Sequence, residues 1–240
     1  NKSYRAGVRL GVVTDTLDIT GETLQEAPVK VGPEDIRKAA FDLQGEFEWE
    51  VPLYSAVKVQ GKRLHEYARE GAPVERPRKI MKFWDVQMGE IRGSEFEVDL
   101  RCSKGSFIRS WIHQLGQNLG CGAAMASLVR TGSMPYELSQ AMTLSELENA
   151  WKGDPEALPC LIPMTQALPW AKRVKVRGHD RGLLMNGQIS HDLRANLITQ
   201  FRPGQDVLIQ IQSDENELLA LVGVEPGRGF VLRRVFKPEP

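Results

Sequence analysis

Apolar and polar positions alternate in several short stretches of the 240-residue chain. Between residues 4 and 15, Val8, Leu10 and Val12 occupy every second position, which predicts a strand with one buried face. Further strands are expected over residues 51–59, 80–91 and 96–102, the last two joined by a hairpin turn at Arg92-Gly93-Ser94. This order favours an antiparallel or mixed sheet in the first part of the chain.

A helical period is clearest after Phe107, where Ile108, Ile112, Leu115 and Leu119 form an apolar stripe that Gly120 ends. Proline is favoured at the first helical position, so Gly32-Pro33 predicts the start of another helix. Two more helices are predicted, over residues 62–70 and from Thr143 through Trp151. Strands and helices together indicate an α+β domain.

Residues 158–169 contain three prolines and are predicted to form a linker. Beyond them, short strands are expected over residues 174–176, 206–212, 218–224 and 230–236. Short strands separated by Gly and Pro are typical of a small β-barrel. We therefore expect an α+β domain over residues 1–168 and a small β-barrel domain over residues 169–240.

The net charge is zero, but the charges are unevenly distributed. Residues 51–110 carry 12 Lys and Arg against 8 Asp and Glu, and residues 172–240 carry 11 against 8. Residues 1–50 and residues 111–171 carry more acidic than basic side chains. Two basic stretches could contact a polyanion in two places, although solvated surface charge explains the same numbers.

No apolar run approaches the length that spans a membrane. The three cysteines are widely spaced and form no CxxC pair, which argues against a disulfide framework or a zinc site. Free thiols suit a reducing compartment, so we expect a cytoplasmic protein. The four histidines are scattered, without the spacing of metal ligands.

Residues 52–63 combine one aromatic side chain, Tyr54, with three cations, Lys58, Lys62 and Arg63. Aromatic and basic side chains in alternation suit a nucleic acid, whose bases stack and whose phosphates pair with cations. A strand edge protected by lysines is an equally good interpretation of this stretch alone.

The run from Cys102 to Arg109 opens the helix after Phe107 and places Arg109 in its first turn. A cation is disfavoured there by the helix dipole, so Arg109 points to an anionic partner, either a phosphate or a buried carboxylate. Lys104 and the backbone around Gly105 could hold a phosphate at the helix N-terminus. The residues alone suggest an RNA-binding protein of two domains without a visible complete active site.

Five motifs recur in the order of one known family over residues 2–145. They are Tyr4-Arg5 with Arg9-Leu10-Gly11; Thr14-Asp15-Thr16 with Asp18 and Gly21; Tyr54-Ser55-Ala56-Val57-Lys58 with Gly61-Lys62; residues 102–109; and Leu119-Gly120-Cys121-Gly122-Ala123 followed by Leu128-Val129-Arg130. The chain therefore resembles the TruB family of bacterial tRNA pseudouridine synthases. Its tail resembles, more loosely, the small PUA RNA-binding barrel that usually closes this family.

The resemblance implies that a uridine of the tRNA T-loop is isomerised to pseudouridine without a cofactor. Tyr4 would stack on the everted base and take part in removing the ring proton, and Arg109 would pair with a nucleophilic aspartate. Phe107 and Leu128 would line the uracil pocket, with Lys58 supporting the site. The remaining substrate-binding residues would be Tyr54, Lys62, Arg63 and Lys104. The expected partner is the tRNA T-arm, the expected oligomeric state is a monomer, and no membrane is involved.

Two departures from the family pattern qualify this picture. Phe107 stands where the family commonly has tyrosine, so a hydroxyl hydrogen bond worth about 1 kcal/mol is lost while stacking survives. Residues 1–240 also contain no Gly-x-Leu-Asp-Pro stretch, which in the family carries the nucleophile. A non-catalytic RNA-binding protein or tRNA chaperone is the alternative.

Because the nucleophile loop is expected upstream of Tyr4, we predict that residues 1–240 alone do not turn over. A tritium-release assay with tRNA labelled at uracil C5 measures this, since isomerisation frees the hydrogen at C5. Release of tritium by residues 1–240 alone would contradict the assignment of the nucleophile.

Overall fold

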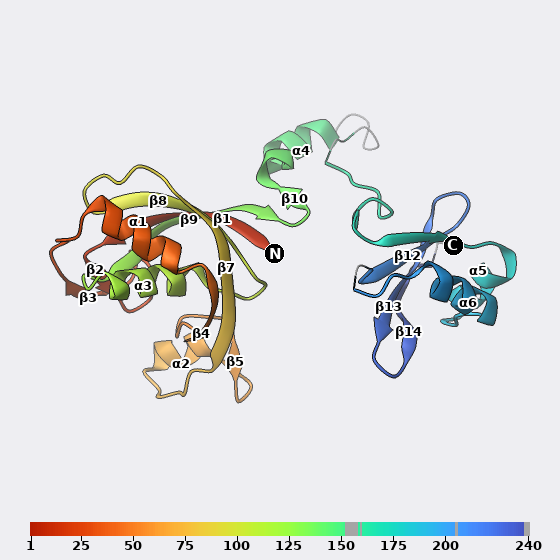
Figure 1. Ribbon diagram of the computed structural model, residues 1–240, viewed down its shortest axis with the longest axis horizontal. Coiled ribbons are helices and arrows are strands. Elements are labelled where there is room, and N and C mark those ends of the chain that lie inside the picture. Colours follow the sequence, from red (N-terminus) through yellow and green to blue (C-terminus); the bar gives the residue numbers. More distant parts are fainter. Residues whose placement is uncertain (152–157, 159, 205, 238–240) are drawn as a thin grey trace. The chain divides into compact units, whose positions relative to one another are not determined.

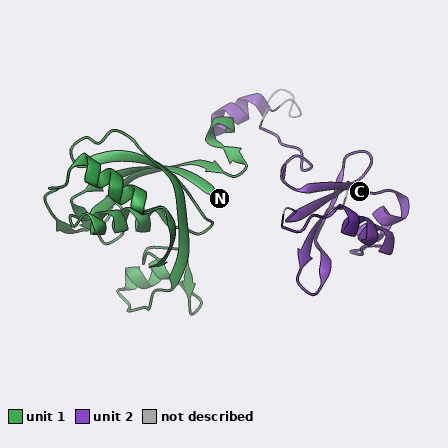
Figure 2. Cartoon of the chain, viewed as in Figure 1, with its two compact units in different colours: residues 1–141 green, residues 142–240 purple. Residues whose placement is uncertain are grey.

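The computed structural model describes residues 1–151, 158, 160–204 and 206–237. Its internal contacts divide the chain into two compact units, Asn1–Ala141 and Met142–Pro240 (Figure 2). The domain boundary expected between residues 168 and 169 lies inside the second unit and remains a prediction. Of the expected linker, Pro159 lies outside the described residues.

The first unit is built on a six-stranded sheet in the order β10-β9-β1-β8-β7-β4. Neighbouring strands are antiparallel throughout, as the sequence pattern predicted. The strands are β1 (Lys2–Leu10), β4 (Gly45–Glu50), β7 (Arg78–Met88), β8 (Glu95–Cys102), β9 (Ala123–Ser133) and β10 (Tyr136–Glu137). Strand β1 lies between β8 and β9, so its side chains meet neighbours from both halves of the sheet.

Helices α1 (Pro33–Asp42) and α3 (Ile108–Asn118) cover one face of this sheet (Figure 1). Pro33 opens α1 as predicted, and the Asp35 carboxylate accepts a hydrogen bond from the backbone of the preceding Gly32. The largest side chain in the interface is Trp111 of α3, which is fully buried and donates from its indole nitrogen to the Leu43 carbonyl at 3.1 Å. Burial of each large apolar side chain contributes about 1.5–3 kcal/mol.

Two short hairpins extend from the sheet. Strands β2 (Val12–Thr14) and β3 (Thr23–Glu26) enclose the loop that contains Asp15 and Asp18. Strands β5 (Lys58–Val59) and β6 (Lys62–Arg63) run directly into α2 (Leu64–Glu70), which Gly71 ends in the left-handed conformation. Residues 55–71 are called the hairpin–helix module below.

The second unit contains a four-stranded sheet in the order β11-β12-β13-β14. Its strands are β11 (Lys172–Lys175), β12 (Leu208–Gln212), β13 (Leu218–Glu225) and β14 (Gly229–Val235). The 3₁₀ helix η1 (Leu138–Gln140) and helix α4 (Leu144–Trp151) precede it along the chain. Thr143 and Glu146 form the predicted capping box of α4, with reciprocal hydrogen bonds of 2.7 and 3.2 Å.

The expected closed barrel is not found among the described residues of the second unit. Strands β11 and β14 remain at opposite edges of the sheet, and β11 is parallel to β12. Between β11 and β12 the chain instead forms two helices, α5 (Gly178–Met185) and α6 (His191–Gln200). The sequence analysis predicted neither helix. Leu184, Leu193 and Leu197 of these helices pack with the sheet residues, so helices supply the cover that barrel closure would otherwise give.

Two further differences concern the first unit. The prediction of a strand over residues 51–59 is wrong, because only Lys58–Val59 forms a strand within that range. The strand lies one segment earlier, in β4, whose residues alternate strictly between half-buried and exposed. Strand β9 was missed because Ala, Ser and Gly have weak strand preference, which its long pairing with β1 overrides.

Helix α3 approaches β9 so closely that one position tolerates only glycine. A Cβ atom on Gly116 would lie 2.1 Å from the Ala123 backbone nitrogen and 2.3 Å from the Gly122 carbonyl carbon. Backbone atoms cannot move aside as a side chain can, so the helix would have to shift off the sheet.

We therefore expect Gly116→Ala to lower the free energy of unfolding of the first unit by about 3 kcal/mol or more. Gly182→Ala in α5 is the matched control, since a Cβ there meets nothing within 4 Å. Alanine is the better helix former, so the control should be neutral or stabilising by about 1 kcal/mol. Urea unfolding of both variants measures the difference, and equal effects would contradict the packing argument.

Candidate active site

Arg109 lies in the first turn of α3, as predicted, and it is half-buried. Its guanidinium donates from Nη1 to the carbonyl of Thr16 at 2.8 Å and from Nη2 to the carbonyl of Tyr54 at 2.7 Å. Burial lowers the pKa of this guanidinium, and the negative charge of Asp18 opposes that shift. An arginine remains charged under all ordinary conditions, so a fixed positive charge stands at this helix N-terminus.

The loop between β2 and β3 provides one of these carbonyls and is held firmly. The Asp18 carboxylate accepts from the backbone and the hydroxyl of Thr20 at 3.0 and 2.6 Å. The loop backbone also pairs with Met125 of β9, through Ile19 at 2.8 Å and Leu17 at 3.0 Å. Hydrogen bonds within the loop and to β9 therefore order this stretch.

Tyr4 stands in β1 opposite Leu100 of β8 and Arg130 of β9. Burial raises the pKa of the Tyr4 phenol, with the thiol of Cys102 acting in the same direction and Arg130 acting against it. The ring is therefore neutral at physiological pH.

Leu128 lies in β9 opposite Ala6, two pairs along from Tyr4 and Arg130. Residues opposite one another in antiparallel strands share a face, so Leu128 and Tyr4 project to the face that α3 covers. Leu128 is 41% exposed, which leaves it free to contact a ligand. Phe107 is the residue that precedes α3, and its half-buried ring packs against the same core as Tyr4.

The predicted cations occupy two places. Lys104 is exposed in the turn before α3, whereas Lys58, Lys62 and Arg63 lie in the hairpin–helix module. Lys62 is already engaged, by an ion pair with Glu70 and by the face of Tyr67 with its ammonium 4.8 Å from the ring centre. Lys58 and Arg63 are exposed and face one another across the hairpin.

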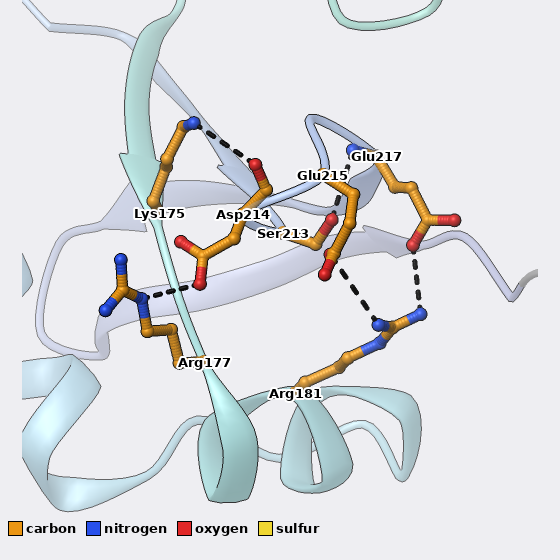
Figure 3. A network of polar contacts seen from close by, with 7 residues as sticks. All are labelled: Lys175, Arg177, Arg181, Ser213, Asp214, Glu215 and Glu217. Carbon is orange, nitrogen blue, oxygen red and sulfur yellow. Dashed lines mark hydrogen bonds and ion pairs between the residues drawn. The ribbon is translucent and has the colours of Figure 1, made fainter.

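Several cations of the second unit are paired within it (Figure 3). The turn between β12 and β13 carries Asp214, Glu215 and Glu217. They face Lys175 of β11, Arg177 immediately before α5, and Arg181 of α5. Arg177 pairs with Asp214, and Arg181 reaches Glu217 at 2.9 Å. Some of the basic residues of this stretch are thus paired with acidic residues of the same stretch, which leaves its net charge unchanged.

Three residues of this site were missed as site members by sequence reasoning. Asp15 and Asp18 were quoted only as parts of a motif, although Asp15 raises the pKa of the Tyr54 phenol and the charge of Asp18 acts on Arg109. Arg130 was quoted only as part of a motif, although it lies opposite Tyr4 in the sheet. Residues two apart in a strand share a face, but β9 was not predicted, so the sequence analysis did not connect Arg130 with Leu128.

Among the residues that the structure describes, no group of three or more His, Cys, Asp or Glu side chains could hold a metal ion. Within the same residues, no helix combines the length and the apolar character needed to cross a membrane.

Comparison with known proteins identifies the family. Residues 1–108 match the N-terminal domain model of the TruB family of pseudouridylate synthases, and residues 109–169 match the C-terminal domain model of tRNA pseudouridylate synthase B. A protein of Bdellovibrio bacteriovorus named tRNA pseudouridine synthase B is 54% identical over 99% of this chain and 77% of its own length. The chain belongs to the TruB family.

A second relative with the same name, from Thermotoga maritima, is 35% identical over 96% of this chain and 72% of its own length. Among solved structures, a chain of a Cbf5-Nop10-Gar1 complex matches with a TM-score of 0.60 at 22% identity, over 98% of this chain and 65% of that one. A chain of an H/ACA RNP bound to a substrate RNA matches with a TM-score of 0.65 at 18% identity, over 99% of this chain and 66% of that one. These structures share the mixed α+β fold with antiparallel sheets.

The two carbonyl contacts predict how Arg109→Lys behaves. Lysine cannot present two donors in the planar geometry of a guanidinium, so at least one of the two charge-assisted bonds is lost. We expect the free energy of unfolding to fall by about 1–3 kcal/mol. Urea unfolding followed by tryptophan fluorescence measures it.

Arg5→Lys is the control, since Arg5 pairs with Asp99 at an exposed site and should cost less than about 1 kcal/mol. A loss for Arg109→Lys no larger than that of the control would show that the two carbonyl contacts do not hold the loops.

Proposed function

We propose that this protein is a tRNA pseudouridine synthase that isomerises a T-loop uridine, with Arg109 and Tyr4 at the reacting base. The observation that carries the proposal is family membership combined with the position of these two residues. Arg109 holds a fixed charge among backbone carbonyls, and Tyr4 presents a neutral ring from the neighbouring sheet. The relatives' common name supports the reaction class.

In this proposal the neutral Tyr4 ring stacks on the everted uracil, with Phe107 and Leu128 as the pocket walls. Eversion costs a few kcal/mol, which stacking and pocket contacts offset. Removal of the ring proton by Tyr4 would require a phenolate, which its burial disfavours. The cation of Arg130 at the hydroxyl is the group that would stabilise it.

Arg109 would pair with the nucleophilic aspartate that the family resemblance implies. The contacts to Thr16 and Tyr54 use one donor on each terminal nitrogen, and a guanidinium has five N–H donors in all. Donors therefore remain for a carboxylate while both loops stay bound. No cofactor takes part in this reaction.

Exposed cations would hold the tRNA T-arm. Lys58 and Arg63 of the hairpin–helix module, with Tyr54 at its base, form the first contact, and Lys104 a second. We further propose that the second unit acts as a PUA-like RNA-binding domain, through exposed cations such as Arg173. We also propose that the protein is a monomer and that it is located in the cytoplasm. No observation favours a non-catalytic RNA-binding protein or tRNA chaperone over the enzyme.

Tritium release by the intact gene product tests the reaction. A T-arm stem-loop labelled at C5 of the single T-loop target uridine should release its tritium, whereas the same stem-loop labelled at a stem uridine should release none. Equal or absent release from both substrates would overturn the proposal.

Binding of the unlabelled T-arm separates free cations from paired ones. Lys58→Ala should weaken binding and reduce its salt dependence, because each phosphate contact releases counterions. Arg181→Ala is the matched control, since its charge is already paired with Glu217. An equal effect of the two variants would contradict the assignment of the module to the RNA.

A further inference from the structure

Leu17, in the loop between β2 and β3, has a backbone conformation that leucine rarely adopts. Its φ is 62°, in the left-handed region, where the Cβ atom of an L-residue crowds the following carbonyl oxygen. That crowding disfavours the conformation by about tenfold in population. Strained residues of this kind persist only where the surrounding structure holds them, and they cluster at functional sites.

Three other non-glycine residues in the described part of the chain have a positive φ, and each has a local reason. Gln60 precedes Gly61 in the two-residue turn of the β5–β6 hairpin, where both central residues need a positive φ. Asp85 and Asn216 are of the residue types that adopt this region most readily. Neither reason applies to Leu17, so the cause lies in the contacts of its loop.

The two peptide groups on either side of the Leu17 Cα atom are bound to different partners. The group before it carries the Thr16 carbonyl, which accepts from Arg109 Nη1 at 2.8 Å. The group after it carries the Leu17 carbonyl, which accepts from the Met125 nitrogen of β9 at 3.0 Å. Because each peptide group is planar, the φ and ψ angles of Leu17 alone set the angle between the two groups. The conformation of Leu17 thus fixes the Thr16 carbonyl relative to β9.

The Leu17 side chain offers a competing explanation. It is half-buried and lines a cavity of about 380 Å³ together with Pro52, Leu53 and His113. If packing in this cavity were its role, other apolar side chains would serve and the positive φ would be incidental. Substitutions separate the two explanations, because the side chains that fill the cavity are not those that tolerate a positive φ.

We propose that Leu17 is a positioning residue, whose left-handed backbone aims the Thr16 carbonyl at Arg109 and so sets the direction of the guanidinium. It acts through Arg109 and does not touch the reacting base. The consequence for catalysis rests on the proposed function, whereas the ordering of the loop on β9 does not. Because Arg109 would pair with the nucleophilic aspartate and not with the RNA backbone, a misdirected guanidinium should lower kcat and leave KM for the T-arm unchanged.

The test compares Leu17→Gly, Leu17→Asn and Leu17→Val in the intact gene product. Glycine and asparagine adopt a positive φ readily, whereas β-branched valine does not. We expect Leu17→Val to speed hydrogen exchange of the Met125 amide by about tenfold and to lower kcat for tritium release by about tenfold. In both measurements Leu17→Gly and Leu17→Asn should stay within about threefold of the unchanged protein, since their backbones accept the native φ.

Leu17→Ala keeps the test decisive if the valine variant does not fold. Alanine and glycine remove nearly the same apolar atoms, but only glycine is free of Cβ crowding at a positive φ. The Met125 amide should therefore exchange more slowly in Leu17→Gly than in Leu17→Ala. Asn216→Val is the matched control, because it places a β-branched residue at a φ of 64° in the second unit. It should leave exchange of the Met125 amide unchanged.

The reverse order, with the valine variant close to the unchanged protein and the glycine and asparagine variants impaired, would assign Leu17 to cavity packing and overturn the proposal. Equal Met125 exchange in all variants would also overturn it, as would a kcat for Leu17→Val no lower than that for Leu17→Gly in an active enzyme. If exchange follows the expected order while the intact unchanged protein releases no tritium, the ordering of the loop by Leu17 stands and the proposed function fails.

Discussion

The guanidinium of Arg109 is the contact on which the organisation of the site depends. It joins the backbones of two loops that are far apart in sequence, at Thr16 and at Tyr54, to the first turn of α3. The helix dipole opposes a cation at this point. Two carbonyl acceptors and the nearby charge of Asp18 offset that opposition, so the charge is stable there without a carboxylate partner within the described residues.

The six-stranded sheet and α3 determine the position of the Arg109 guanidinium. Helix α3 is pressed onto β9 by the absence of a side chain at Gly116 and by the buried Trp111. Strand β9 in turn holds the Asp18 loop through Met125 and presents Leu128 and Arg130 beside β1. One tight helix–strand contact thus positions the charged group, the loop and the apolar wall together.

The two basic stretches of the sequence differ in which of their cations are paired with acidic side chains. In the hairpin–helix module, Lys58 and Arg63 are exposed while Lys62 is occupied by Glu70. In the second unit, the turn after β12 neutralises Arg177 and Arg181. Counting charges along the chain overestimates the surface available to a polyanion, because pairing depends on residues that are close only in the folded chain.

The amino-acid sequence by itself determined the local elements with strong periodic or capping signals: the strand at Val8 and Leu10, the helix start at Pro33, the apolar stripe of α3 and the capping box at Thr143. The strand predicted as continuous through Val12 ends at Leu10, because Gly11 turns the chain and Val12 begins β2 in another sheet. The sequence also placed Arg109 against its helix dipole, and its motifs indicated the family. The tertiary structure alone decided the rest. Strand β9 forms because β1 offers it a partner, despite residues with weak strand preference. Helices α5 and α6 replace barrel closure because their leucines cover the second sheet. Asp15, Asp18 and Arg130 become site residues through contacts across long sequence separations, which no local pattern encodes.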